Sequence, residues 1–152
     1  MSFNRLVRPD SSNEDFLTLI NLLDVDLAIR DGDDHEFYQQ FNGLEALKNV
    51  IVAYYNDIAI GCSAFKEFNA YSVEIKRIYT KQAARGKGLV IIVLKDLEAW
   101  AKENSYTSSV LETGLKQPEA IALYKKNVYP LIPNYGQYEG VQTSVCFKKL
   151  FQ

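Results

Sequence analysis

The chain has 152 residues, 47% of them apolar, which is enough for a single domain with its own core. Its 17 basic and 19 acidic residues are mixed along the sequence and give a net charge of −2, so we expect no nucleic-acid partner. The first ten residues lack an apolar signal segment, and the longest apolar run, Leu89 to Leu94, is too short to span a bilayer, so we expect a cytoplasmic protein without membrane contact.

The N-terminal part predicts one strand and two helices. Phe3 to Arg8 fits a strand, and the polar residues after it fit a helix start with Ser12 as the cap. That helix runs to about Arg30, and its apolar face is Phe16, Leu19, Ile20, Leu23 and Leu27. Residues 31–34 break the pattern, and a short second helix follows that closes at Asn42-Gly43.

Three strands come next. Asn49 to Tyr55 and Ile58 to Glu67 are rich in β-branched and aromatic residues, and Asn56-Asp57 between them fits a two-residue hairpin turn. Val73 to Thr80 is the third strand.

A glycine loop, Arg85-Gly86-Lys87-Gly88, separates that strand from an apolar-faced helix that runs to about Asn104. Two glycines let the backbone turn so that several N–H groups point at one place, and the helix dipole and two mobile cations add positive potential there. The loop therefore predicts a site for a phosphate-bearing ligand. On the helix, Lys95, Asp96, Glu98 and Lys102 are expected to face solvent.

The remaining elements complete a mixed α/β pattern. Ser108 to Glu112 fits a strand, Pro118 suits the first turn of a helix, and Tyr129 to Ile132 and Thr143 to Phe151 fit two closing strands. The predicted order is β-α-α-β-β-β-α-β-α-β-β. Cys62 and Cys146 lie among alternating apolar residues, so we expect reduced, buried thiols and no metal site.

This order of elements and the glycine loop together resemble the GNAT superfamily of N-acetyltransferases. The family signature Gln/Arg-x-x-Gly-x-Gly/Ala stands here as residues 83–88, and the resemblance is densest from Val73 to Tyr129. It implies one domain over residues 1–152, with a mixed, mostly antiparallel sheet of about seven strands flanked by about four helices, and acetyl-coenzyme A as co-substrate. Ala83, Val90 and Val128 depart from the family pattern.

The resemblance also implies which residues bind the coenzyme. Backbone N–H groups of the loop would hold the pyrophosphate, Ile78 and Thr80 would bond the pantetheine arm, and the N–H of Ile78 would polarise the acetyl carbonyl. The implied coenzyme-binding residues are Ile78, Tyr79, Thr80, Arg85, Gly86, Lys87, Gly88, Leu89, Val90, Gln117 and Tyr124.

Three side chains are candidates for catalysis. Glu74 resembles the general base of several family members in its placement; alternatively it is a strand-end carboxylate paired with Lys76 or Arg77. Glu112 is the rival base. Tyr124 matches the family tyrosine that acts as general acid toward the coenzyme thiolate, and the alternative is an aromatic ring packed on the inner face of its helix.

The acceptor site is implied to lie between the segment that joins the first two helices and the loop before the last strand. Asp33 and Asp34 would attract a cationic amine, and Tyr38, Tyr135 and Tyr138 would wall its apolar part. The alternative is a solvated acidic loop.

The expected function is direct transfer of acetyl, in a ternary complex, to the primary amine of a small-molecule or amino-acid-like acceptor. The alternative is a non-catalytic coenzyme A-binding sensor, or an interaction module, on a degenerate fold, motivated by the three departures from the family pattern. A homodimer through the C-terminal strands and aromatic surfaces is left open.

Overall fold

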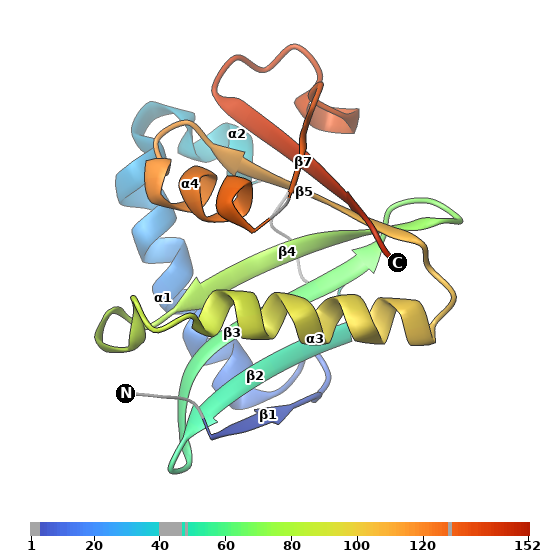
Figure 1. Ribbon diagram of the computed structural model, residues 1–152. Coiled ribbons are helices and arrows are strands. Elements are labelled where there is room, and N and C mark those ends of the chain that lie inside the picture. The colour runs from blue at the N-terminus through green and yellow to red at the C-terminus, as the bar shows by residue number, and fades with distance from the viewer. Residues whose placement is uncertain (1–3, 40–46, 48, 128) are drawn as a thin grey trace.

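Figure 1 shows the fold in the computed structural model, which describes residues 4–39, 47, 49–127 and 129–152. Its seven-stranded sheet has the order β1-β2-β3-β4-β5-β7-β6, and all neighbouring pairs are antiparallel except β4 and β5. The strands are β1 (Arg5–Val7), β2 (Asn49–Tyr55), β3 (Ile58–Glu67), β4 (Ser72–Thr80), β5 (Ser108–Gly114), β6 (Leu131–Ile132) and β7 (Ser144–Leu150). The α-helices are α1 (Glu14–Asp31), α2 (His35–Gln39), α3 (Leu89–Glu103) and α4 (Pro118–Lys126). The predicted order and sheet type are confirmed.

The helices cover both faces of the sheet, with α3 across one face and α1 behind the other (Figure 1). On β2, Ile51 and Ala53 belong to the core under α3, whereas Val50 and Val52 belong to the core under α1. Successive side chains of a strand point to opposite faces, so a strand buried on both faces is apolar throughout. Among the described residues, no helix has the length and apolar composition needed to cross a membrane.

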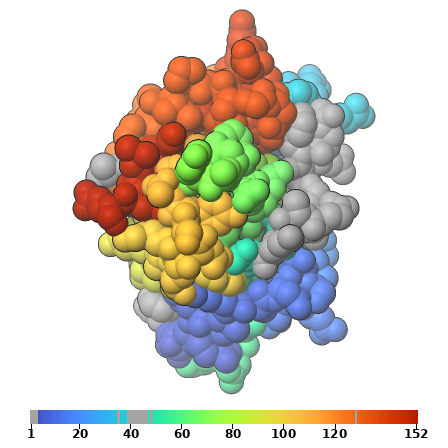
Figure 2. All heavy atoms as spheres, turned by 90° about the vertical axis from the view of Figure 1, so that its right-hand side faces the viewer, coloured from blue at the N-terminus to red at the C-terminus, as the bar shows by residue number. Residues whose placement is uncertain are grey.

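The parallel pair β4 and β5 is joined only at one end. Its register covers three residue pairs, from Ser72 with Ser108 to Glu74 with Val110. That end is closed by the β3–β4 turn, residues 104–107 and the C-terminal residues, which lie together in Figure 2, and the N–H of Thr107 donates to the carbonyl oxygen of Tyr71 at 2.8 Å. Beyond Glu74 the strands separate, so their facing backbone groups are left for other partners.

Several boundaries differ from those predicted. The cap of α1 is Asn13, whose Oδ1 accepts from the N–H of Phe16 at 3.0 Å, while Ser12 bonds to Asp10 instead. Both residue types cap helices well, so the sequence did not distinguish them. The first and sixth strands are shorter than predicted, and β5 continues to Gly114. The predictions that involve Phe3, Asn42-Gly43 and Val128 lie outside the described residues.

Glu98 was predicted to face solvent, and this was wrong. Its side chain is 13% exposed, accepts from the hydroxyl of Tyr129 at 2.8 Å and pairs with Lys149 Nζ at 2.8 Å.

The predicted hairpin turn at Asn56-Asp57 is confirmed, since both residues have positive φ, 46° and 69°.

The two cysteines are free and buried, as predicted. Burial raises the pKa of the Cys62 thiol to about 12 and that of the Cys146 thiol to about 11. Neither thiol therefore carries appreciable thiolate at neutral pH.

Gly61 allows α3 to approach the sheet closely. A Cβ at this position would lie 2.8 Å from Leu89 Cδ2 and 3.0 Å from the carbonyl oxygen of Tyr79. We expect Gly61→Ala to lower the free energy of unfolding by about 1–3 kcal/mol because of overpacking, measured by urea denaturation. The cost should shrink when Leu89→Ala is combined with it, and an equal cost in both backgrounds would show that Leu89 is not the obstacle.

Candidate active site

The glycine loop leads directly into α3. Gly86 and Gly88 have φ of 79° and 78°, and a Cβ at either would meet no heavy atom within 4 Å, so the described chain leaves the space above them open. Gly88 is the N-cap of α3 and has no side chain to bond the first N–H groups. These N–H groups and the helix dipole therefore suit an anion.

A cavity of about 360 Å³ lies over this loop, and we call it the loop cavity. It extends from the loop along the end of β4 to α4 and includes every implied coenzyme-binding residue except Lys87. The shared residues are Ile78, Tyr79, Thr80, Arg85, Gly86, Gly88, Leu89, Val90, Gln117 and Tyr124. The cavity is also lined by α1 residues that had no predicted role in coenzyme binding: Leu23, Asp26, Leu27 and Arg30.

Arg85 is not the mobile cation that we expected. Its Nε donates to the carbonyl oxygen of Thr80 at 2.9 Å, and its Nη2 lies 3.1 Å from Asp26 Oδ2. The side chain therefore connects the loop to β4 and α1. Val90 lies in the first turn of α3 and does not disturb the start of the helix.

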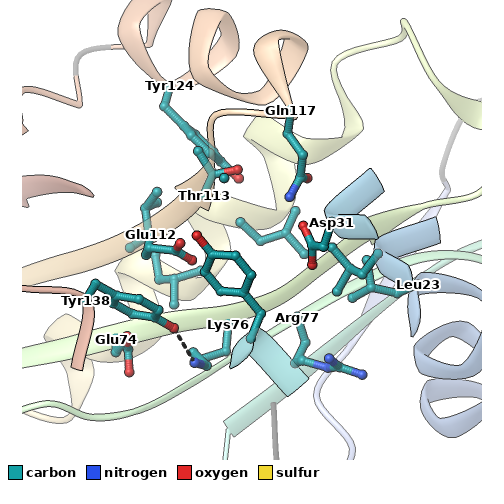
Figure 3. Close-up of a pocket in the computed structure, with 16 residues that line it drawn as sticks. Leu23, Asp31, Glu74, Lys76, Arg77, Glu112, Thr113, Gln117, Tyr124 and Tyr138 are labelled. Carbon is teal, nitrogen blue, oxygen red and sulfur yellow. Dashed lines mark hydrogen bonds between the residues drawn. The ribbon is translucent and has the colours of Figure 1, made fainter. Parts of the chain in front are cut away.

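A second cavity of about 110 Å³ adjoins the first, and we call it the charged cavity. The two share Leu23, Leu27, Ile78, Gln117 and Tyr124. The charged residues that line the second cavity are Asp31, Glu74, Lys76, Arg77 and Glu112. Figure 3 shows Glu112, Lys76 and Tyr138 on one side of the cavity, Tyr124 and Gln117 above it, and Arg77 turned away toward α1.

Glu112 lies on the part of β5 that has separated from β4. Its buried Oε2 has no hydrogen-bond partner among the described residues. Burial raises the pKa of this carboxyl to about 7, and the charges of Asp31 and Glu74 add to the rise, while the Ser144 hydroxyl and the Lys76 ammonium oppose it. Glu112 can therefore take up or release a proton near neutral pH.

Glu74 has a different environment. It is 2% exposed, its Oε2 accepts from the Tyr135 hydroxyl at 2.7 Å, and its Oε1 lies 3.8 Å from Lys66 Nζ. Its ion-pair partner is thus Lys66, not Lys76 or Arg77. This carboxylate holds the loop before β7 against β4.

Tyr124 combines the two interpretations considered for it. Its ring packs against Tyr129 and Phe147, with centroids 6.0 Å and 5.5 Å away, and the residue also lines both cavities. Burial, and secondarily the charge of Glu112, raises the pKa of this phenol above its usual value, so it keeps its proton.

The predicted acceptor residues divide into two groups. Tyr38 and Tyr138 line the charged cavity, and the Tyr38 hydroxyl is fixed by Thr143 and Ser144 at 2.7 Å and 2.8 Å. Tyr135 acts on this wall through its bond to Glu74. Asp33 and Asp34 line neither cavity: Asp33 is exposed, and Asp34 lies 3.4 Å from Lys116 Nζ. The structure therefore does not place these two aspartates at the site.

Three residues of the charged cavity had no predicted role in the site: Asp31, Lys76 and Arg77. For Lys76 and Arg77 the signal in the sequence was two adjacent basic residues within a strand that is buried along most of its length. Arg77 has a φ of 61° where the β3–β4 register shifts, and its Nη2 bonds Asp24 on α1 at 2.7 Å. Among the described residues, no group of three or more His, Cys, Asp or Glu could hold a metal ion.

Comparisons with known proteins agree with this geometry. The chain is similar to a structure described as an acyl-CoA N-acyltransferase from Klebsiella pneumoniae, with 26% sequence identity over 97% of each chain and a TM-score of 0.81. It is also similar to a GNAT family acetyltransferase from Elizabethkingia anophelis with acetyl-CoA bound (19% identity, 97% of each chain, TM-score 0.70). An acetyltransferase from Bacillus subtilis in complex with CoA has 16% identity over 97% of this chain and 99% of that chain, with a TM-score of 0.69. No curated protein matches the chain.

The fold is thus that of acyl-coenzyme A-dependent acyltransferases. The model of the acetyltransferase (GNAT) family matches residues 16–128. The chain belongs to this family.

The environment of Glu112 predicts a pH-dependent stability. Its pKa is raised from 4.5 to about 7, so its contribution to stability is fully present below pH 4.5 and is lost as pH rises to 7. Relative to wild type, Glu112→Gln should therefore gain up to about 3 kcal/mol of unfolding free energy between pH 4.5 and 8, measured by denaturant titration. Glu139→Gln, at an exposed position, is the control substitution, and a pH-independent difference between Glu112→Gln and wild type would contradict the assignment.

Proposed function

We propose that this protein transfers an acetyl group from acetyl-coenzyme A to the primary amine of a small acceptor. The transfer is direct and takes place in a ternary complex of enzyme, coenzyme and acceptor. One observation carries the proposal: the cavity over the glycine loop and the charged cavity meet at Ile78 and Tyr124, where β4 and β5 have separated. A donor in one cavity and an acceptor in the other would have their reacting ends side by side.

The loop cavity fits the coenzyme. Open space above two left-handed glycines and an uncapped helix N-terminus favour a phosphate-bearing group. Ile78 and Thr80 lie on the part of β4 that β5 no longer pairs, so they are candidates to bond an extended arm. When bound, acetyl-coenzyme A supplies an activated acyl thioester.

Glu112 is our choice for the general base. Its unpaired Oε2 and its pKa of about 7 suit a group that takes a proton from an ammonium ion. Glu74, whose oxygens face Tyr135 and Lys66, is proposed to position the acceptor wall instead.

Tyr124 is proposed to protonate the leaving thiolate, and the N–H of Ile78 to stabilise the negative charge on the acetyl oxygen. The acceptor nitrogen forms a bond to the acetyl carbon while the carbon–sulfur bond breaks. The acceptor ammonium loses two protons in forming the amide: one goes to Glu112, which makes the amine nucleophilic, and the other replaces the proton that Tyr124 has given to the thiolate. Glu112 then releases its proton to water, so both residues return to their starting states.

Turnover tests the proposal. Acetyl-coenzyme A and a panel of small primary amines should give thiol release matched by acetylated amine, and kcat/KM should rise through a pKa near 7. Glu112→Gln should remove that limb and lower kcat/KM by about 10²–10⁴-fold, the usual contribution of a general base. Calorimetric binding of the coenzyme without turnover would favour the sensor alternative, and no binding would favour the interaction module.

Replacement of the Tyr124 hydroxyl separates chemistry from binding. Tyr124→Phe should lower kcat by about 10²-fold through loss of the proton donor and change the KM for acetyl-coenzyme A far less. Tyr129→Phe is the matched control, because Tyr129 packs on the same ring but lines neither cavity. Equal, small effects of the two variants would remove Tyr124 from the mechanism.

A further inference from the structure

Lys76 is a buried cation at the wall of the charged cavity. The residue is 9% exposed, and its ammonium lies near the Tyr138 hydroxyl, at 3.4 Å (Figure 3). No carboxylate oxygen in the described part of the chain lies within 4.0 Å of Nζ. Buried charges are normally paired, so the position of this ammonium needs a physical explanation.

The neighbouring charges do not provide a counterion. Burial lowers the pKa of Lys76; the carboxylates of Glu74 and Glu112 oppose that shift, and the cations Lys66 and Arg77 reinforce it. Glu74 is already bonded by Tyr135 and faces Lys66. Arg77 is paired with Asp24, so Glu112 is the acid that remains to balance Lys76, and no direct ion pair joins these two in the described chain.

The size of the cavity limits what can enter. At about 110 Å³ it is smaller than the roughly 300–1,000 Å³ typical of drug-sized ligands. Its remaining walls include Leu23, Ile75, Leu111 and the Tyr38 ring. A small molecule with one apolar part fits these walls.

Building on the proposed acetyl transfer, we propose that the acceptor is a small amino acid whose carboxylate pairs with Lys76 while its amine faces Glu112. The cavity then holds each charge of the zwitterion against an opposite one, which offsets the desolvation of both. A diamine would bring a second cation toward Lys76. A peptide N-terminus carries an amide where the amino acid carries its carboxylate.

Matched probes test this assignment. Wild-type enzyme is assayed with free amino acids of differing size and amine-to-carboxylate spacing, with their amides, and with dipeptides. Its kcat/KM for the best acid should exceed that for the matched amide by about 10–100-fold, the usual effect of a hydrogen bond to a charged group. The dipeptides should react as poorly as the amides.

Variants of Lys76 identify the group responsible. Lys76→Met should lower kcat/KM for the acid by about 10–100-fold more than kcat/KM for the matched amide, mainly through KM. Lys76→Arg should restore part of the preference. The control Lys95→Met, at an exposed position of α3, should change neither. Melting curves of each variant check that it is folded, and Lys76→Gln replaces Lys76→Met if the latter does not fold.

The outcomes separate this inference from the proposed function. If the amides react as well as the acids, or if Lys76→Met keeps the preference or lowers both substrates equally, the carboxylate assignment is wrong while acetyl transfer stands. If no amine is acetylated, the proposed function fails. Calorimetry with the same acids and amides then decides the role of Lys76: acid binding that Lys76→Met removes supports it, and equal binding of acids and amides overturns it.

Discussion

The short parallel pairing between β4 and β5 is the constraint on which the rest of the site depends. Three residue pairs join the strands at one end, and that end is closed by the contacts of Tyr71 and Thr107. Because the strands then diverge, the backbone of β4 beyond Glu74 is free to bond a ligand. Glu112 lies on the part of β5 that no longer pairs with β4. A longer pairing would close both cavities and satisfy the same backbone groups within the sheet.

Glu74 and Glu112 both line the charged cavity but differ in their surroundings. Glu74 is more buried, but both of its oxygens have partners, since Oε2 accepts a hydrogen bond from Tyr135 and Oε1 faces Lys66. Glu112 has an oxygen without a partner in the described chain and so holds its proton up to about pH 7. Pairs of acids whose environments differ in this way commonly have separate roles in a reaction.

The sequence predicted the fold and the glycine loop before α3 well because both depend on local patterns, whereas the coenzyme-binding residues outside the loop were implied by the family resemblance. Turn residues, helical spacing and two glycines before a helix are readable from neighbouring positions. The charged cavity was harder to predict, since Lys76 and Glu112 come from different strands and the bulge at Arg77 leaves no sequence signal. Glu98 was misassigned for the same reason: its partners, Tyr129 and Lys149, lie outside its own helix.

The buried cysteines matter for a reaction that produces a thiol. Cys146 lies directly opposite Glu112 in the β5–β7 register, close to the proposed point of transfer, and Cys62 lies within the α1-side core. Exchange with a disulfide requires a thiolate that the disulfide can reach. Burial raises the pKa of both thiols and also keeps other molecules away from them. The proposed release of coenzyme A would therefore not lead to capture of either cysteine as a mixed disulfide, even where oxidised coenzyme accumulates.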